Sequence, residues 1–189
     1  MLMLTIYFCF CIMKLKKFRQ NRCDIMSRIF AVCGRICSGK THYCARLTQK
    51  ENAVVLSCDE IFYDIFHKDA GEKHDELAAD VKRYLLKKAD EIVRAGCNVV
   101  LDWGFWQRNE REEYRKRCRS AGTEVQWHYI DISDEDWLRN IDERNRSIEA
   151  GISPDYYIDE GLMKKAVALF EAPDRDEIDV WYSFTRDTD

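Results

Sequence analysis

The sequence predicts a three-layer α/β fold in which helices cover both faces of a five-stranded parallel sheet. Short apolar runs alternate along the chain with segments whose apolar residues recur at helical spacing. This alternation is typical of βαβ units, which connect right-handedly into a parallel sheet. A glycine-bounded loop also follows the first apolar run, at the sheet edge where such folds bind ligands. A chain of 189 residues has the usual length of one domain.

The strands are predicted from short apolar runs bounded by turn residues. The clearest is Val99-Val100-Leu101, a continuous run of the kind found in a parallel sheet with both faces covered. Asn52 marks a turn before a β-branched run that begins at Ala53. Together the runs predict strands over 28–33, 53–57, 98–102, 124–130 and 178–182.

The helices are predicted from the spacing of apolar residues and from residues that end helices. Leu77, Val81 and Leu85 trace one face of a long helix, and Gly96 ends it as a left-handed cap. Gly151 and Pro154 separate the last two helices. These patterns predict helices over 40–50, 60–67, 75–95, 108–120, 134–149 and 159–170.

The first 26 residues differ from the rest of the chain. Residues 1–13 are almost wholly apolar, and basic residues follow them, whereas a secretory signal has its positive charge first. The apolar run of about 12 residues is too short to span a bilayer, which takes roughly 20. We therefore expect residues 1–26 to be an extension outside the fold, with Met26 as the natural start, and residues 27–189 to form the domain.

The charge and the cysteines narrow the class of protein. The net charge is −4, without the strongly basic face typical of proteins that bind nucleic acid irrespective of sequence. The nine cysteines are odd in number, scattered, and lack a C-x-x-C pair. Reduced thiols in the cytoplasm are the interpretation that this pattern favours. We expect no membrane segment, and a nucleic-acid partner is possible but not favoured.

The glycine-bounded loop has the form G-x-x-x-x-G-K-T and lies between a predicted strand and a predicted helix, the context of a phosphate-binding P-loop. Its backbone N–H groups and the helix start form a nest for anions. We expect Lys40 to reach the β- and γ-phosphates of ATP and the Thr41 hydroxyl to bind Mg²⁺. The residues predicted to hold the nucleotide are Gly34, Arg35, Ile36, Cys37, Ser38, Gly39, Lys40 and Thr41.

Two aspartates follow predicted strands and should share the edge of the sheet with this loop. Asp102 closes an apolar run and is the predicted second ligand of Mg²⁺, directly or through water. Asp59 is the predicted general base that accepts a proton from the acceptor hydroxyl. Either aspartate alone could instead be a helix N-cap, and the two roles could be exchanged.

This layout resembles the small P-loop kinases grouped with polynucleotide kinase, chloramphenicol phosphotransferase and zeta toxin. The resemblance depends on four segments and extends from Arg28 to about Pro173. It implies the P-loop NTPase fold with a short helical lid, and it carries the role of catalytic base onto Asp59. The segments are Gly34–Thr41, Ser57–Asp59, Leu101–Phe105 with Arg111, and the arginine-rich helix Arg139–Arg146.

The resemblance also implies that arginines of the lid close over the phosphates. The matching positions are Arg139, Arg144 and Arg146, with Arg144 as the catalytic one and the other two as nucleotide ligands. A guanidinium there would offset charge on the transferred phosphoryl group. The alternative is a solvated helix face on which Asp142 and Glu143 accompany these arginines.

The acceptor is the least defined part of the prediction. The loop after Asp102 is rich in aromatics, and we expect Phe105 and Trp106, with Asp59 and Arg111, to bind it. The tryptophans could instead pack under the next helix. The predicted function is an ATP- and Mg²⁺-dependent kinase that phosphorylates a hydroxyl of a small molecule. The alternatives are a kinase of nucleic-acid 5′-hydroxyl ends, a zeta toxin-like kinase of an activated amino sugar, and a non-catalytic ATP-binding module.

Overall fold

The computed structural model describes residues 27–66, 71–153 and 155–184, and within them the predicted α/β architecture is confirmed. The predicted extension 1–26 and the last residue of the predicted helix 60–67 lie outside these residues. The strands are β1 (Arg28–Cys33), β2 (Ala53–Ser57), β3 (Asn98–Gly104), β4 (Glu124–Asp131) and β5 (Val180–Ser183). The helices are α2 (Lys40–Glu51), α3 (Cys58–Asp64), α4 (His74–Arg94), α5 (Arg108–Ala121), α6 (Asp134–Glu149) and α7 (Glu160–Leu169), with 3-10 turns at Gly71–Lys73 and Arg175–Glu177.

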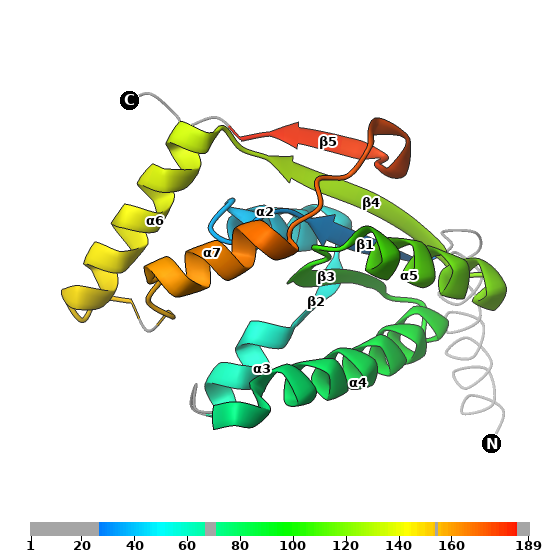
Figure 1. Cartoon of the computed structure of the whole chain (residues 1–189). Coiled ribbons are helices and arrows are strands. Elements are labelled where there is room, and N and C mark those ends of the chain that lie inside the picture. The colour runs from blue at the N-terminus through cyan, green and yellow to red at the C-terminus, as the bar shows by residue number, and fades with distance from the viewer. Residues whose placement is uncertain (1–26, 67–70, 154, 185–189) are drawn as a thin grey trace, which may run out of the picture.

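The five strands form one parallel sheet in the order β2-β3-β1-β4-β5. Helix α2 lies on one face of the sheet, and α4 and α5 lie on the other (Figure 1). The central position of β1 places the loop that follows it in the middle of one sheet edge. The pair β1 and β3 stays in register up to Val32 opposite Asp102, and a bulge follows. The loop and the tip of β3 therefore lie side by side.

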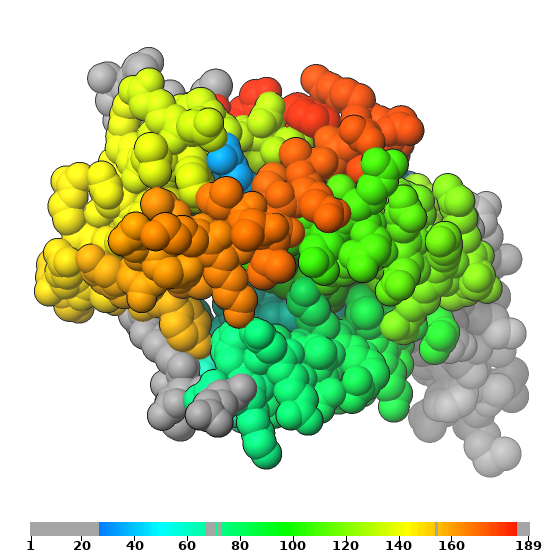
Figure 2. Space-filling model, in the orientation of Figure 1, coloured from blue at the N-terminus to red at the C-terminus, as the bar shows by residue number. Residues whose placement is uncertain are grey.

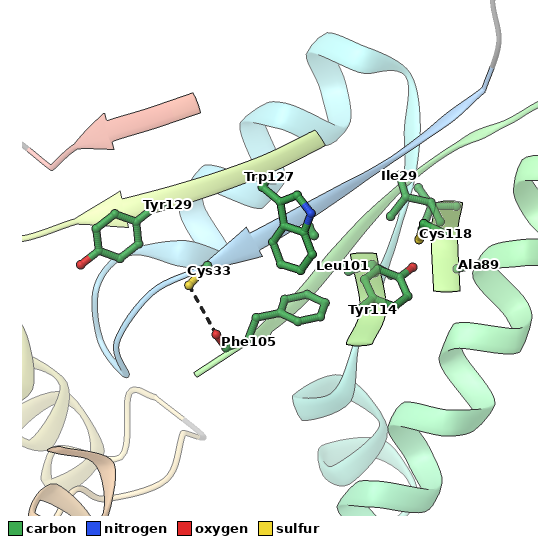
Figure 3. Close-up of a cluster of buried hydrophobic side chains, with 11 residues drawn as sticks. Ile29, Cys33, Ala89, Leu101, Phe105, Tyr114, Cys118, Trp127 and Tyr129 are labelled. Carbon is green, nitrogen blue, oxygen red and sulfur yellow. Dashed lines mark hydrogen bonds between the residues drawn. The ribbon is translucent and has the colours of Figure 1, made fainter. Parts of the chain in front are cut away.

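Alternation along β1 divides the core into two clusters. Phe30 and Val32 face α2, where they pack with Cys44 and Leu47. Ile29, Ala31 and Cys33 face the other way, into the larger cluster beneath α4 and α5. Figure 3 shows this second cluster, in which the ring of Phe105, the residue after β3, meets aromatic rings of β4 and α5. Both faces of β1 are thus buried, as the continuous apolar run of a central parallel strand requires.

Most predicted ends agree with the structure to within one residue, but those of α3, β3 and β5 differ by more. Strand β5 begins at Val180 instead of residue 178, and α3 ends at Asp64 instead of residue 67. Helix α3 begins at Cys58, two residues early, because the Ser57 side chain caps it and accepts a hydrogen bond from the Glu60 N–H at 3.4 Å. Strand β3 continues to Gly104, past the predicted end at Asp102. No helix among the described residues is both long and apolar enough to cross a bilayer.

Candidate active site

The loop between β1 and α2 is held against the tip of β3. The Gly34 N–H donates to the Gly104 carbonyl at 3.1 Å. A Cβ at position 34 would lie 2.8 Å from Ser38 Oγ, so the closely packed loop requires glycine there. Gly39 is the N-cap of α2 with φ 86°, a left-handed conformation that glycine adopts without strain. The two motif glycines thus allow the loop to fold tightly back on itself.

Helix α6 holds the outer side of this loop. Trp137 Nε1 donates to the Ile36 carbonyl at 2.7 Å, and Asn140 Nδ2 donates to the Cys37 carbonyl at 2.9 Å. The two donors are three residues apart and so share one face of the helix. These two hydrogen bonds fix the Ile36–Cys37 part of the loop against α6. The sequence prediction missed Trp137 and Asn140, although their helical spacing with Arg144 was readable.

The two basic side chains of the loop, Lys40 and Arg35, contact different parts of the structure. Lys40 Nζ donates to the Arg35 carbonyl at 2.6 Å, within the same loop. The Arg35 guanidinium faces α6 instead, where it pairs with Asp134 at 2.8 Å and lies 4.7 Å from the centre of the Trp137 ring. The Arg35 side chain therefore anchors the loop to α6. The Lys40 ammonium, in contrast, stays against the backbone of the loop itself.

The two predicted aspartates lie on the same rim as this loop. Asp102, in β3, is opposite Val32 on one side and Ser57 on the other, and it is 7% exposed. Asp59 lies in the first turn of α3, directly after β2. Neither residue is a helix cap, because Ser57 caps α3 and Asp102 lies within a strand. The alternative interpretation of the two aspartates as caps is therefore wrong.

The surroundings of Asp59 favour a carboxylate that can take up a proton. Burial raises the pKa of Asp59 above its usual value, Lys40 opposes this, and the charge of Asp102 raises it further. Arg144 lowers the pKa and Asp155 raises it, each with a smaller effect. Because these groups influence one carboxyl, they surround one site. A carboxylate with a raised pKa is a stronger base, as general-base catalysis near neutral pH requires.

Thr41 and Asp102 offer a donor set that fits Mg²⁺. Thr41 lies in the first turn of α2, and Asp102 lies in the strand against which α2 packs. A hydroxyl and a carboxylate are hard oxygen ligands, and Mg²⁺ in kinases takes only one or two protein ligands beside phosphates and water. The described residues hold no cluster of three or more His, Cys, Asp or Glu side chains fit for a metal.

Of the three predicted lid arginines, the structure brings only Arg144 to the loop. Its Nη1 lies 3.4 Å from Cys37 Sγ, and its Nη2 lies 3.5 Å from Asp155 Oδ1. Arg139 is exposed and pairs with Glu135 at 2.8 Å on its own helix. Arg146 is exposed as well. Arg139 and Arg146 thus lie on the exposed face of α6, and their contacts with the nucleotide remain predictions.

Phe105, predicted to bind the acceptor, belongs to the core instead. It is 1% exposed, and its ring stacks on Tyr114 at 5.6 Å between centroids and meets the Trp127 ring edge-on at 5.0 Å (Figure 3). Trp106 is half-buried, and its indole lies against Gly104 beside the loop. Its contact with the acceptor remains a prediction.

Arg111, also predicted to bind the acceptor, is a structural residue. It is 0% exposed and forms a two-pronged ion pair with Glu177, at 2.9 and 3.2 Å. Its Nη1 also donates to the carbonyls of Phe105 and Glu171. The side chain thus ties α5 to the aromatic loop and to the segment before β5.

Replacing Arg111 by methionine is expected to destabilise the fold by about 3–5 kcal/mol, because the carboxylate of Glu177 would remain buried without its partner. For a domain of this size that corresponds to a fall in Tm of about 10 °C. Thermal unfolding followed by circular dichroism measures it. Arg119→Met, at an exposed position of the same helix, is the matched control, and equal Tm values for the two variants would contradict the assignment.

Comparison with known proteins supports the fold described above. The model of a family described as an AAA domain matches residues 29–155, and no curated protein sequence matches. A sugar kinase from Janibacter sp. HTCC2649 has a TM-score of 0.60 at 18% identity, over 83% of this chain and 85% of that one. The APS kinase CysC of Mycobacterium tuberculosis, solved with AMPPNP and APS, has a TM-score of 0.57 at 19% identity, over 85% of this chain and 90% of that one.

A third solved structure has a similar fold. Kti12 of Chaetomium thermophilum, in complex with ADP-AlF3, has a TM-score of 0.60 at 17% identity and covers 85% of this chain and 90% of its own. At these identities the likeness concerns the fold. It confirms the predicted P-loop NTPase fold and the predicted resemblance to small P-loop kinases.

Proposed function

The chain belongs to the AAA domain family, and from that premise we propose that it is an ATP-dependent kinase that phosphorylates a hydroxyl of a small molecule. The observation that carries the proposal is the meeting of Lys40, Asp59, Asp102 and Arg144 beside one phosphate-binding loop. A module that only bound ATP would need no buried carboxylate with a raised pKa next to the lysine of the loop.

The residues of the site have separate roles in the proposed reaction. The loop binds the phosphates through its backbone N–H groups, and Lys40 balances negative charge on the transferred phosphoryl group. Asp59 accepts the proton of the acceptor hydroxyl, whose oxygen bonds to the γ-phosphorus as the bond to the bridging oxygen breaks and ADP leaves. Arg144, reaching across from α6, offsets charge on the other side of the loop. Thr41 and Asp102 would hold Mg²⁺, which neutralises phosphate charge when bound.

A small-molecule acceptor is favoured over a nucleic-acid end by charge. The net charge is −4, and most cations around the site already have partners: Arg35 pairs with Asp134, and Arg144 pairs with Asp155. A strand of nucleic acid needs a row of free cations along its phosphates. Two solved structures of similar fold, a sugar kinase and an APS kinase, also support a small acceptor.

Screening by mass spectrometry tests the proposal. Pools of sugars, polyols, hydroxy acids, nucleosides and aminoglycosides are incubated with the protein, ATP and Mg²⁺, and products heavier by one phosphoryl group are sought. We expect at least one small molecule to gain that mass and to do so only with ATP. A folded, ATP-binding protein that phosphorylates no small molecule in any pool would contradict the proposal.

A further inference from the structure

Two buried polar atoms near Asp59 have no hydrogen-bond partner in the described part of the chain. They are the hydroxyl oxygen of Tyr156 and Nε of Arg144. Buried polar groups are nearly always hydrogen-bonded in native proteins, so two orphans in one place need an explanation. Arg144 Nε can only donate a hydrogen bond, whereas a tyrosine hydroxyl can donate and accept. A ligand that satisfied both would therefore present an acceptor to Arg144 Nε and a group such as a hydroxyl, which can accept or donate, to Tyr156.

The two atoms belong to one cluster that faces the catalytic carboxylate. The rings of Tyr63 and Tyr156 pack with centroids 5.4 Å apart, and the Tyr63 hydroxyl donates to Asp155 Oδ1 at 3.1 Å. The same Asp155 oxygen lies 3.5 Å from Arg144 Nη2. Burial raises the pKa of Tyr156, and the charge of Asp59 adds to the rise. Tyr156 and Arg144 thus belong to one cluster of side chains near Asp59.

Two contacts near this cluster join parts of the chain that are far apart in the sequence. The Tyr63–Asp155 hydrogen bond joins α3 to the segment after α6, across 92 positions of the sequence. A second contact, Lys165 with Asp75 at 3.2 Å, joins α7 to α4. Figure 2 shows a recess between α7 and the helices α3 and α4, bounded by these elements. A recess bridged in two places admits a compact molecule more readily than a polymer strand.

We propose that Tyr156 Oη and Arg144 Nε form the acceptor-recognition site and bind an oxygen adjacent to the hydroxyl that Asp59 deprotonates. The inference rests on the proposed kinase function and adds the class of acceptor: a small polyhydroxylated molecule, such as a sugar, sugar alcohol or sugar acid. In such a molecule, neighbouring oxygens reach Asp59 and the two donors together. Tyr63 and Asp155 position this site by holding the Tyr156 ring and the Arg144 guanidinium.

The test compares Tyr156→Phe with Tyr157→Phe. The phenylalanine keeps the ring of Tyr156 and removes only its hydroxyl. Tyr157 is the neighbouring tyrosine and is 48% exposed. Each protein receives ATP labelled at the γ-phosphate together with sugars, sugar alcohols and sugar acids, the low-molecular-mass fraction of a cell extract, or a 5′-hydroxyl oligonucleotide. Initial rates provide KM and kcat separately for ATP and for the acceptor.

We expect wild type and Tyr157→Phe to label the same polyhydroxylated molecule. Tyr156→Phe should lower kcat/KM for that acceptor by about tenfold to a hundredfold and leave KM for ATP unchanged, because one hydrogen bond to the acceptor is lost. Comparing a sugar acid with its alcohol shows whether the bound oxygen is charged. Equal acceptor kinetics for the two variants, or labelling of the oligonucleotide alone, would overturn the assignment of Tyr156 and Arg144 to acceptor recognition. The protein would still be a kinase in either case. If no protein labels any acceptor, the proposed function fails as well.

Discussion

Replacing Lys40 by alanine is expected to reduce phosphoryl transfer by about two to four orders of magnitude. The ammonium acts on charge that develops on the transferred group, so its loss raises the barrier more than it weakens substrate binding. The fold should survive, because in the described part of the chain the Lys40 ammonium donates to a carbonyl within its own loop. The rate of product formation under saturating ATP and acceptor measures the effect.

Lys50→Ala is the matched control for this prediction. Lys50 lies at the other end of α2, its side chain is 78% exposed, and its ion pair with Glu51 spans 3.5 Å. The two substitutions remove the same charge from the same helix. A difference in turnover between the two variants is therefore due to the position of the lysine and not to the net charge. Similar turnover in both variants would exclude Lys40 from the reaction.

Replacing Asp59 by asparagine is expected to abolish transfer to the acceptor and to leave ATP binding intact. The amide matches the carboxylate in shape but cannot accept the proton of the hydroxyl. Asp64→Asn, on an exposed position of the same helix, should behave as wild type. Isothermal titration with a non-hydrolysable ATP analogue and a transfer assay separate the two readouts. Transfer by Asp59→Asn at the wild-type rate would assign the base to another group.

The pH profile provides a second reading of the same residue. Burial raises the pKa of Asp59, so the base is lost by protonation at a higher pH than an ordinary aspartate would require. The wild-type rate should therefore be full at neutral pH and fall as the pH decreases through this raised value. The rate should follow a single protonation on this acid limb. A profile that stayed flat down to the usual range of aspartate would contradict the assignment.

Short-range patterns were sufficient for most of the fold. Strands β1 and β2 and helix α6 have the predicted bounds, and the motif loop joins the predicted strand to the predicted helix. Each of these signals lies within a few consecutive residues. The juxtaposition of Asp59 and Asp102 also followed from sequence, because the carboxyl ends of parallel strands meet at one edge of a sheet. Their roles in catalysis stay predictions.

The errors concern contacts between residues far apart in the chain. Arg111 seemed available to a ligand until its partner Glu177, 66 positions away, was placed beside it. Phe105, in the loop that Arg111 holds, was predicted to bind the acceptor but is buried in the core. Tyr156 and Asp155 gave no local signal, because they matter only once the chain has returned to α3, whose Tyr63 lies 92 positions from Asp155. Helical spacing on α6 could have separated Arg144 from Arg139, since only one face of that helix meets the loop.

The fate of the γ-phosphate tests the central claim most directly. Wild-type protein is mixed with ATP, Mg²⁺ and the acceptor pool, and phosphorus NMR follows the γ-phosphate signal over time. The account predicts that this signal decays while a phosphomonoester of a small molecule grows at the same rate. Release of inorganic phosphate alone, or an unchanged γ-phosphate signal from a protein shown to bind ATP, would contradict it.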